Sequence, residues 1–209
     1  TCTDIRKIRK MNPEDFLDGI GSPLAPLGTA KQTELGAWII DGNTYPSYKK
    51  FEQIFEKYEE KHKDVGNGYL YYRNNFSYPK DIDGVLDFHR FVKACIADSR
   101  LPIKVGDFQK CWGIKYMEGD YSGLHNHTPG KQMTAVLFLT GAEKSFKYPL
   151  AGNLITLTPG DHDINYHTFT PEPGACVIMD GNVYHGTYPA TSERRTFVCD
   201  FEYEVIQGQ

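Results

Sequence analysis

Three histidines in the second half of the chain have the residue type and spacing of a metal site. His125 and His127 stand two positions apart before the apolar run TAVLFL, and His185 follows the apolar run CVIM. Alternate residues of a β-strand point to one face, so His125 and His127 can enter the same cavity. A neutral imidazole binds metal without losing a proton near pH 7. The pattern predicts a shared metal site, and the alternative is two exposed loop histidines with His185 unrelated to them.

The order of motifs around these histidines resembles that of the 2-oxoglutarate- and iron(II)-dependent oxygenases, particularly the prolyl 4-hydroxylase-like branch. That family places a tyrosine, a glycine-rich turn and an H-x-D motif before an apolar strand. A P-x-x-G turn, a second apolar strand, a distal histidine and a basic residue follow. The matching elements here are Tyr116, Gly119-Asp120-Tyr121, His125-Asn126-His127, Pro171-Glu172-Pro173-Gly174, His185-Gly186 and Arg194-Arg195. The resemblance covers roughly residues 110 to 205.

The resemblance implies an Fe(II) site in which two histidines and a carboxylate leave positions open for 2-oxoglutarate and O₂. His125 and His185 match the two histidines, whereas His127 stands where the family has Asp or Glu. Three arrangements fit this departure: all three histidines bind the metal, His127 stays off it, or a carboxylate from elsewhere completes the shell. Candidates for that carboxylate are Asp120, Asp161 and Asp163. A native metal other than iron also fits.

The two consecutive arginines are candidates for binding the distant carboxylate of 2-oxoglutarate, because an arginine fork meets a carboxylate with two hydrogen bonds. Strand alternation puts Arg195 on an apolar face with Phe197, Cys199 and Phe201. It puts Arg194 on a face with Thr196, Val198, Asp200 and Glu202, which we expect to be outward and solvated. The pattern favours Arg195 as the inward clamp, and the R-x-T pairing of some relatives keeps Arg194 as the alternative. Tyr116 matches a family tyrosine that helps to hold the co-substrate, and its alternative role is that of a core tyrosine.

The elements that must position these side chains are short strands in the second half and helices in the first. Apolar runs separated by Pro and Gly turns predict strands from residue 108 onward. Apolar residues at helical spacing predict helices over 47–62 and 83–98. We expect one mainly β domain over residues 1–209, with a helical support and substrate-facing region in 1–105 and a jelly-roll core in 106–209. The resemblance implies a double-stranded β-helix, a cupin-like barrel, and the helices would cover one of its sheets.

Composition excludes several classes of function. Hydrophobic residues make up 40% of the chain and charged residues 24%, with a net charge of −4. No Lys/Arg-rich run suggests nucleic-acid binding, and no apolar stretch approaches the roughly 20 residues that span a bilayer. The five scattered cysteines contain no C-x-x-C pair, which favours reduced thiols and a cytoplasmic location.

The function implied by the resemblance is that of a dioxygenase that hydroxylates a C–H bond and releases succinate and CO₂. A peptide or protein side chain is the favoured substrate. The Tyr-rich segment 69–78 and the histidines His162 and His167 are candidates to face it, or they serve structural roles. Two alternatives fit the same residues: a three-His cupin-type metal oxygenase without 2-oxoglutarate, and a non-catalytic jelly-roll binding or structural protein.

Overall fold

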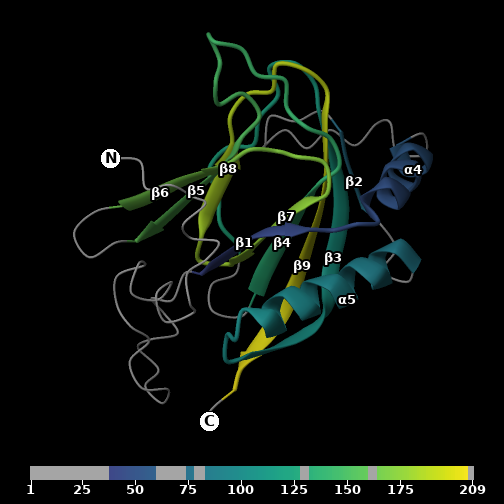
Figure 1. Ribbon diagram of the computed structural model, residues 1–209, viewed down its shortest axis with the longest axis vertical. Coiled ribbons are helices and arrows are strands. Elements are labelled where there is room, and N and C mark those ends of the chain that lie inside the picture. The colour runs from purple at the N-terminus through teal and green to yellow at the C-terminus, as the bar shows by residue number, and fades with distance from the viewer. Residues whose placement is uncertain (1–37, 60–73, 78–82, 128–131, 160–163, 207–209) are drawn as a thin grey trace.

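The computed structural model describes residues 38–59, 74–77, 83–127, 132–159 and 164–206. Within these ranges the chain forms nine strands and two helices, and every strand pairing is antiparallel (Figure 1). Neither helix is both long enough and apolar enough to cross a membrane.

Two sheets form the body of the protein. The larger sheet has the strand order β1-β7-β4-β9-β3-β2, and the smaller has the order β6-β5-β8. The larger sheet consists of β1 (Ile39–Thr44), β2 (Asn74–Ser77), β3 (Ile103–Tyr116), β4 (Gln132–Phe138), β7 (Ala175–Asp180) and β9 (Arg194–Val205). The smaller consists of β5 (Leu154–Pro159), β6 (Ile164–Phe169) and β8 (Tyr184–Thr187). Leu154 and Phe169 of the smaller sheet pack against Val136 and Val198 of the larger, so the two sheets enclose a shared interior.

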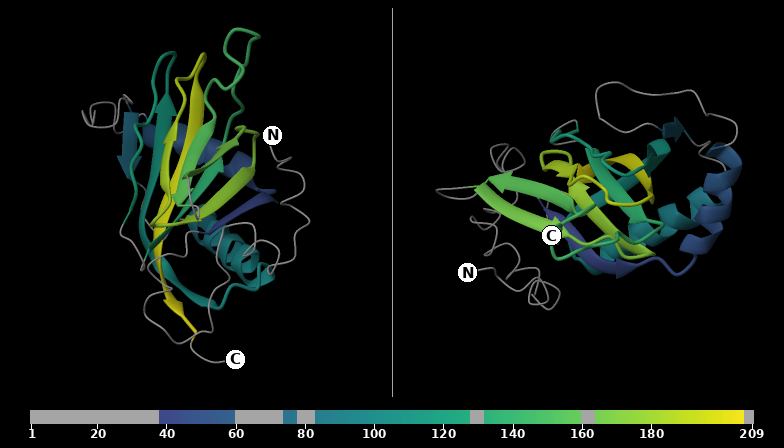
Figure 2. Two further views of the ribbon diagram at one scale, coloured as in Figure 1. Left: turned by 90° about the vertical axis from the view of Figure 1, so that its left-hand side faces the viewer. Right: turned by 90° about the horizontal axis from the view of Figure 1, so that it is seen from above.

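The two helices lie on the opposite face of the larger sheet. They are α4 (Tyr48–Glu59) and α5 (Asp83–Asp98), which agree with the helices predicted from periodicity within the described residues. Phe51 and Phe88 are fully buried and contact Phe197 of β9. Figure 2 shows the resulting order of layers, with the helices and the smaller sheet on either side of the larger sheet. The predicted fold class, a mainly β jelly roll covered by helices on one sheet, is confirmed.

The central strand β9 is buried on both of its faces. Phe197, Cys199 and Phe201 belong to the core beneath the helices. Val198, between them in sequence, belongs to the core between the sheets. The side chains of β9 that alternate with the phenylalanines therefore line the barrel interior, and these include polar residues.

Candidate metal centre

The three histidines come from two chain segments that are joined by their backbones. His125 and His127 lie between β3 and β4, and His185 lies in β8. The N–H of His125 donates to the carbonyl of His185 at 2.9 Å, and the N–H of His185 donates to the carbonyl of His125 at 2.7 Å. The N–H of Thr187 donates to the carbonyl of Ser122, which extends the pairing. The segment thus borders β8 and is joined to it by backbone hydrogen bonds.

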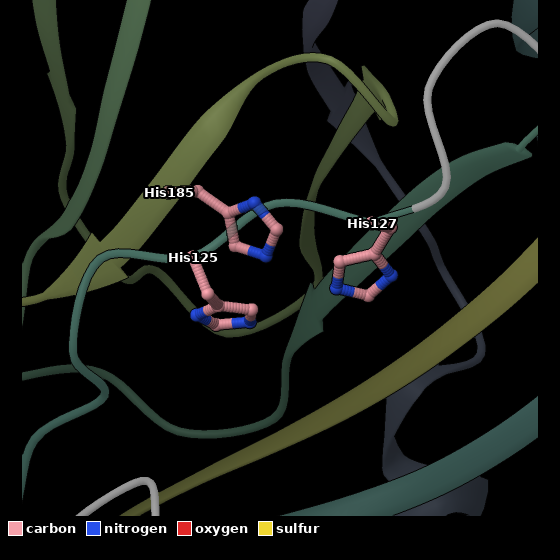
Figure 3. Close-up of side chains that lie close together, drawn as sticks. All are labelled: His125, His127 and His185. Carbon is pink, nitrogen blue, oxygen red and sulfur yellow. The ribbon is translucent and has the colours of Figure 1, made fainter.

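The side chains of these histidines converge on one point in the barrel (Figure 3). One potential ligand nitrogen from each ring lies within 4.8 Å of the others. Among the described His, Cys, Asp and Glu residues, this is the one group of three or more that meets the geometry of a metal site. The structure therefore brings together all three histidines that the sequence singled out.

Hydrogen bonds orient the rings of His125 and His185 for metal binding. Nδ1 of His125 lies 2.8 Å from the carbonyl oxygen of Gly123, and Nδ1 of His185 lies 3.1 Å from that of Val183. A carbonyl oxygen only accepts, so each Nδ1 must carry the proton and donate it. In a neutral ring the other nitrogen, Nε2, then keeps its lone pair. Nε2 is therefore the atom that each ring would offer to a metal.

The electrostatic surroundings keep these imidazoles uncharged. Burial, together with the neighbouring rings of His125 and His127, lowers the pKa of His185 to about 3. Burial also lowers the pKa of His125. A buried ring that resists protonation offers its lone pair to a cation at neutral pH, and this is the form that a metal requires.

His127 differs from the other two histidines because its Nδ1 faces a carboxylate. Asp200 Oδ1 lies 2.8 Å from His127 Nδ1, and Thr134 Oγ1 lies 3.0 Å from the same nitrogen. The sequence placed Asp200 on a solvated face, but its side chain is buried in the barrel interior. Arg194 and Asp200 are six residues apart on one strand, so their side chains point to the same face. This alternation is the sequence signal that could have placed Asp200 beside the site once Arg194 was known to face the barrel.

Of the three carboxylates proposed to complete the metal shell, Asp120 is the one within the described residues, and it does not join the histidines. Asp120 accepts a hydrogen bond of 2.8 Å from the N–H of Met117 and closes the turn that follows β3. Asp161 and Asp163 lie outside the described residues, as do His162 and most of the Tyr-rich segment 69–78.

Arg194 projects into the barrel interior and is 1% exposed. None of its three guanidinium nitrogens has a hydrogen-bond partner among the described residues. Its Cζ lies 4.0 Å from the centre of the Tyr116 ring, and Tyr116 is its direct neighbour in the β3–β9 register. Burial lowers the pKa of this guanidinium, and Tyr116 offsets part of the effect. A buried cation without hydrogen bonds is costly, so the position fits a site for an anion.

Arg195 lies on the outer surface of the sheet, contrary to the orientation expected from the sequence. Its Nε donates to Glu193 Oε1 at 2.7 Å, and its Nη1 donates to Glu56 Oε1 at 3.3 Å. The expectation was wrong because it assigned the apolar face of β9 to the barrel interior. That face packs under the helices, whereas the more polar face with Arg194 lines the barrel.

Further polar atoms in the barrel lack partners. Thr196 Oγ1, Thr156 Oγ1 and Asn153 Oδ1 are buried without a hydrogen-bond partner among the described residues. Thr196 shares the face of Arg194 on β9, and Thr156 lies directly between His185 and His167 in the register of the smaller sheet. Tyr116 shares a hydrogen bond of 2.7 Å with Ser122, which links the surroundings of Arg194 to the segment that carries His125. The interior therefore holds a cation and hydroxyl groups that a polar ligand can satisfy.

No protein-family model matches this chain, and no curated protein sequence matches it either. Solved structures match its fold. The viral collagen prolyl hydroxylase of Paramecium Bursaria Chlorella virus-1, in complex with 2OG, aligns with a TM-score of 0.57 and 13% identity, over 81% of this chain and 96% of that chain. A Trichoplax adhaerens prolyl hydroxylase, in complex with a hypoxia inducible factor peptide fragment, aligns with a TM-score of 0.56 and 13% identity, over 97% of this chain and 94% of that chain.

A third match extends the comparison beyond prolyl hydroxylases. The non-heme α-ketoglutarate dependent carbocyclase SnoK, from nogalamycin biosynthesis, aligns with a TM-score of 0.57 and 13% identity, over 84% of each chain. At such identities the comparisons establish a common fold. The chain therefore has the jelly-roll fold that the sequence resemblance implied, the one shared by prolyl hydroxylases and other 2-oxoglutarate-dependent oxygenases.

Proposed function

We propose that this protein is an Fe(II)- and 2-oxoglutarate-dependent oxygenase. The observation that carries the proposal is the buried guanidinium of Arg194, whose nitrogens have no hydrogen-bond partner among the described residues, in the same barrel interior as the three convergent histidines. An oxo-dicarboxylate has a chelating end that suits a metal and a distant carboxylate that suits an arginine. The interior offers a partner for each end.

The donor set fits a metal of this class. Three imidazoles suit iron as well as zinc, copper and nickel, and they leave coordination positions open on a six-coordinate ion. Fe(II), when bound, would supply the activation of O₂ and the oxidation of a C–H bond. His125, His127 and His185 would hold it through Nε2. The geometry of the three histidines supports metal binding. The nearby Arg194, which suits 2-oxoglutarate, supports iron as the metal.

The residues around Arg194 would hold and orient the co-substrate. Arg194 would donate to the distant carboxylate in a bidentate manner, and Thr196 Oγ1 would add a further donor. The Tyr116 ring holds the guanidinium plane in place from the other side. The apolar walls between the sheets, among them Val136, Val177 and Val198, would exclude water from the site.

The reaction that we propose is hydroxylation of a C–H bond with succinate and CO₂ as co-products, and peptides are the first substrate class to test. Of the matched structures, one holds a peptide fragment and another is a carbocyclase, so the fold alone does not define the substrate. His167 lies across Thr156 from His185, about 10 Å away by strand spacing. It shares the inner face of the smaller sheet and is a candidate to contact the substrate.

The proposal is tested by titrating the metal-free protein with Fe(II) under argon and then with 2-oxoglutarate, followed by an assay for succinate in air. We expect one metal per chain, metal-dependent binding of 2-oxoglutarate and slow formation of succinate even without a primary substrate. Metal binding without 2-oxoglutarate binding would favour a three-His oxygenase of another type, a candidate supported by the absence of a carboxylate among the described ligands. If the protein binds no stoichiometric metal, the remaining explanation is a non-catalytic jelly-roll protein.

A further inference from the structure

We propose that Asp200 is a positioning residue that acts through His127, fixing this ring as a metal ligand and placing a negative charge directly behind it. The inference rests on the metal site of the proposed function. It concerns a residue that the sequence assigned to a solvated face. It also bears on whether His127 joins the metal.

Asp200 is held in place by burial and by a hydrogen bond from a neighbouring strand. Asp200 is 5% exposed, and Thr134 is fully buried. The two residues lie opposite each other in the β4–β9 register, and Thr134 Oγ1 donates to Asp200 Oδ1 at 2.8 Å. His127 Nδ1 lies 2.8 Å from that same carboxylate oxygen. Three side chains from three segments thus meet at one point.

This arrangement determines which nitrogen of His127 carries the proton. The single hydroxyl proton of Thr134 is used for Asp200, so Thr134 can only accept from His127. An unprotonated Nδ1 would place its lone pair against a carboxylate oxygen at 2.8 Å, which is repulsive. Nδ1 therefore donates, and in a neutral ring Nε2 keeps its lone pair on the side of His125 and His185. Figure 3 shows one ring nitrogen of His127 directed toward those rings and the other directed away.

The partner of His127 distinguishes it from the other two ligands. His125 and His185 donate to neutral backbone carbonyls, whereas Nδ1 of His127 lies 2.8 Å from a carboxylate oxygen and 3.0 Å from the threonine hydroxyl bonded to that oxygen. A negative charge next to the Nδ1–H of a histidine increases the basicity of the other ring nitrogen, the one that would face the metal, more than a neutral carbonyl does. The negative charge absent from the three imidazole ligands would thus lie one residue behind the metal, on Asp200.

The test uses Co(II) alone, followed by calorimetry and by the visible absorption bands that report cobalt coordination. Asp200→Asn keeps the size of the side chain and removes its charge. Because outer-shell partners of metal-bound histidines typically change affinity by roughly 10- to 100-fold, we expect a loss of that order and shifted cobalt bands. Thr134→Val should produce a smaller loss in the same direction, and Thr134→Ser should restore wild-type behaviour. Asp120→Asn, which alters an equally buried carboxylate in a turn, is the matched control and should leave the cobalt spectrum unchanged.

The possible results distinguish a failure of the metal site from a failure of the proposed role of Asp200. If the wild-type protein binds no Co(II), the metal site itself fails. If the wild type binds Co(II) and the Asp200 and Thr134 variants bind it with equal affinity and identical bands, the role of Asp200 is refuted while the site stands. An unchanged spectrum for His127→Ala would show that His127 and Asp200 contact each other away from the metal, which also refutes the inference. If Asp200→Asn does not fold, Thr134→Val carries the same test.

Discussion

Arg194 and Arg195 are consecutive in sequence and face opposite sides of β9. Arg194 is enclosed in the barrel above the Tyr116 ring, and Arg195 pairs with Glu193 and Glu56 on the surface. Because the two residues have the same side chain and differ only in the face that they occupy, they form a natural pair for mutational tests. A substitution that affects ligand binding at one position has its control at the other.

Arg194→Lys should weaken binding of 2-oxoglutarate to the metal-loaded protein by about tenfold or more. Lysine keeps the charge but loses the planar fork, and a hydrogen bond to a charged group contributes about 1.5–3 kcal/mol. Calorimetry with 2-oxoglutarate measures the effect. Arg195→Lys should bind 2-oxoglutarate as the wild type does, because Arg195 lies on the outer surface. If the Arg195 variant loses binding and the Arg194 variant retains it, the proposed clamp is at the wrong residue.

Arg194→Met should increase the stability of the ligand-free protein while abolishing binding of 2-oxoglutarate. The guanidinium is buried with no hydrogen-bond partner among the described residues, and even buried ion pairs, whose charges compensate each other, can often be replaced by apolar side chains at no cost or with a gain of about 1–4 kcal/mol. Urea denaturation in the presence of a chelator measures the free energy of unfolding. A strong destabilisation would mean that the guanidinium has structural partners that the fold requires.

Gly186→Ala should separate the two segments that carry the histidines. A Cβ at Gly186 would lie 2.8 Å from the carbonyl oxygen of Ser122 and 3.1 Å from the carbonyl carbon of Gly123, and backbone atoms cannot move aside as a flexible side chain can. We expect a loss of about 1–3 kcal/mol in stability, as for other overpacked sites, together with weaker Co(II) binding. Gly123→Ala is the matched control, because a Cβ there meets no atom within 4 Å. Equal behaviour of the two variants would contradict the close approach.

The metal-free protein should lose stability as the pH falls below 6.5. The pKa of His185 is about 3 in the folded protein, compared with 6.5 for an ordinary histidine. Between these values the unfolded chain binds a proton at this residue that the folded chain does not, so acidification favours unfolding. The contribution of His185 is about 1.4 kcal/mol per pH unit. Urea denaturation at about pH 7 and about pH 5 should show a smaller loss for His185→Gln than for the wild type. Equal losses would show that His185 titrates normally.

The strands, the helices and the pairing of His125 with His127 were predictable because their signals are local. Apolar runs between Pro and Gly turns mark the strands, and the spacing of Phe51 and Phe55 marks a helix. His125 and His127 were recognised from alternation within one short segment. These inferences needed only residues close together in the chain, whereas the jelly-roll fold and the grouping with His185 came from the family resemblance of the motif order over residues 110–205.

The orientation of the arginines and the role of Asp200 were not predictable in the same way. Alternation shows which residues share a face, but it does not show which face is the barrel when both are buried. The contact of Asp200 with Thr134 and His127 depends on the register between β4 and β9, two strands far apart in sequence. That register is a property of the assembled sheet, and no local pattern encodes it.

The two-sided burial of β9 also determines how the chain tolerates changes of length. Insertion of one residue early in β9 would exchange the two faces of the strand and move Phe197 into the barrel and Asp200 under the helices. One such insertion would therefore disrupt both the packing of the core under the helices and the arrangement of the polar residues in the barrel. Insertions into the loops beside this strand would leave both faces in place. A library of single-residue insertions should therefore show β9 as a segment with almost no surviving variants, bordered by loops where many survive.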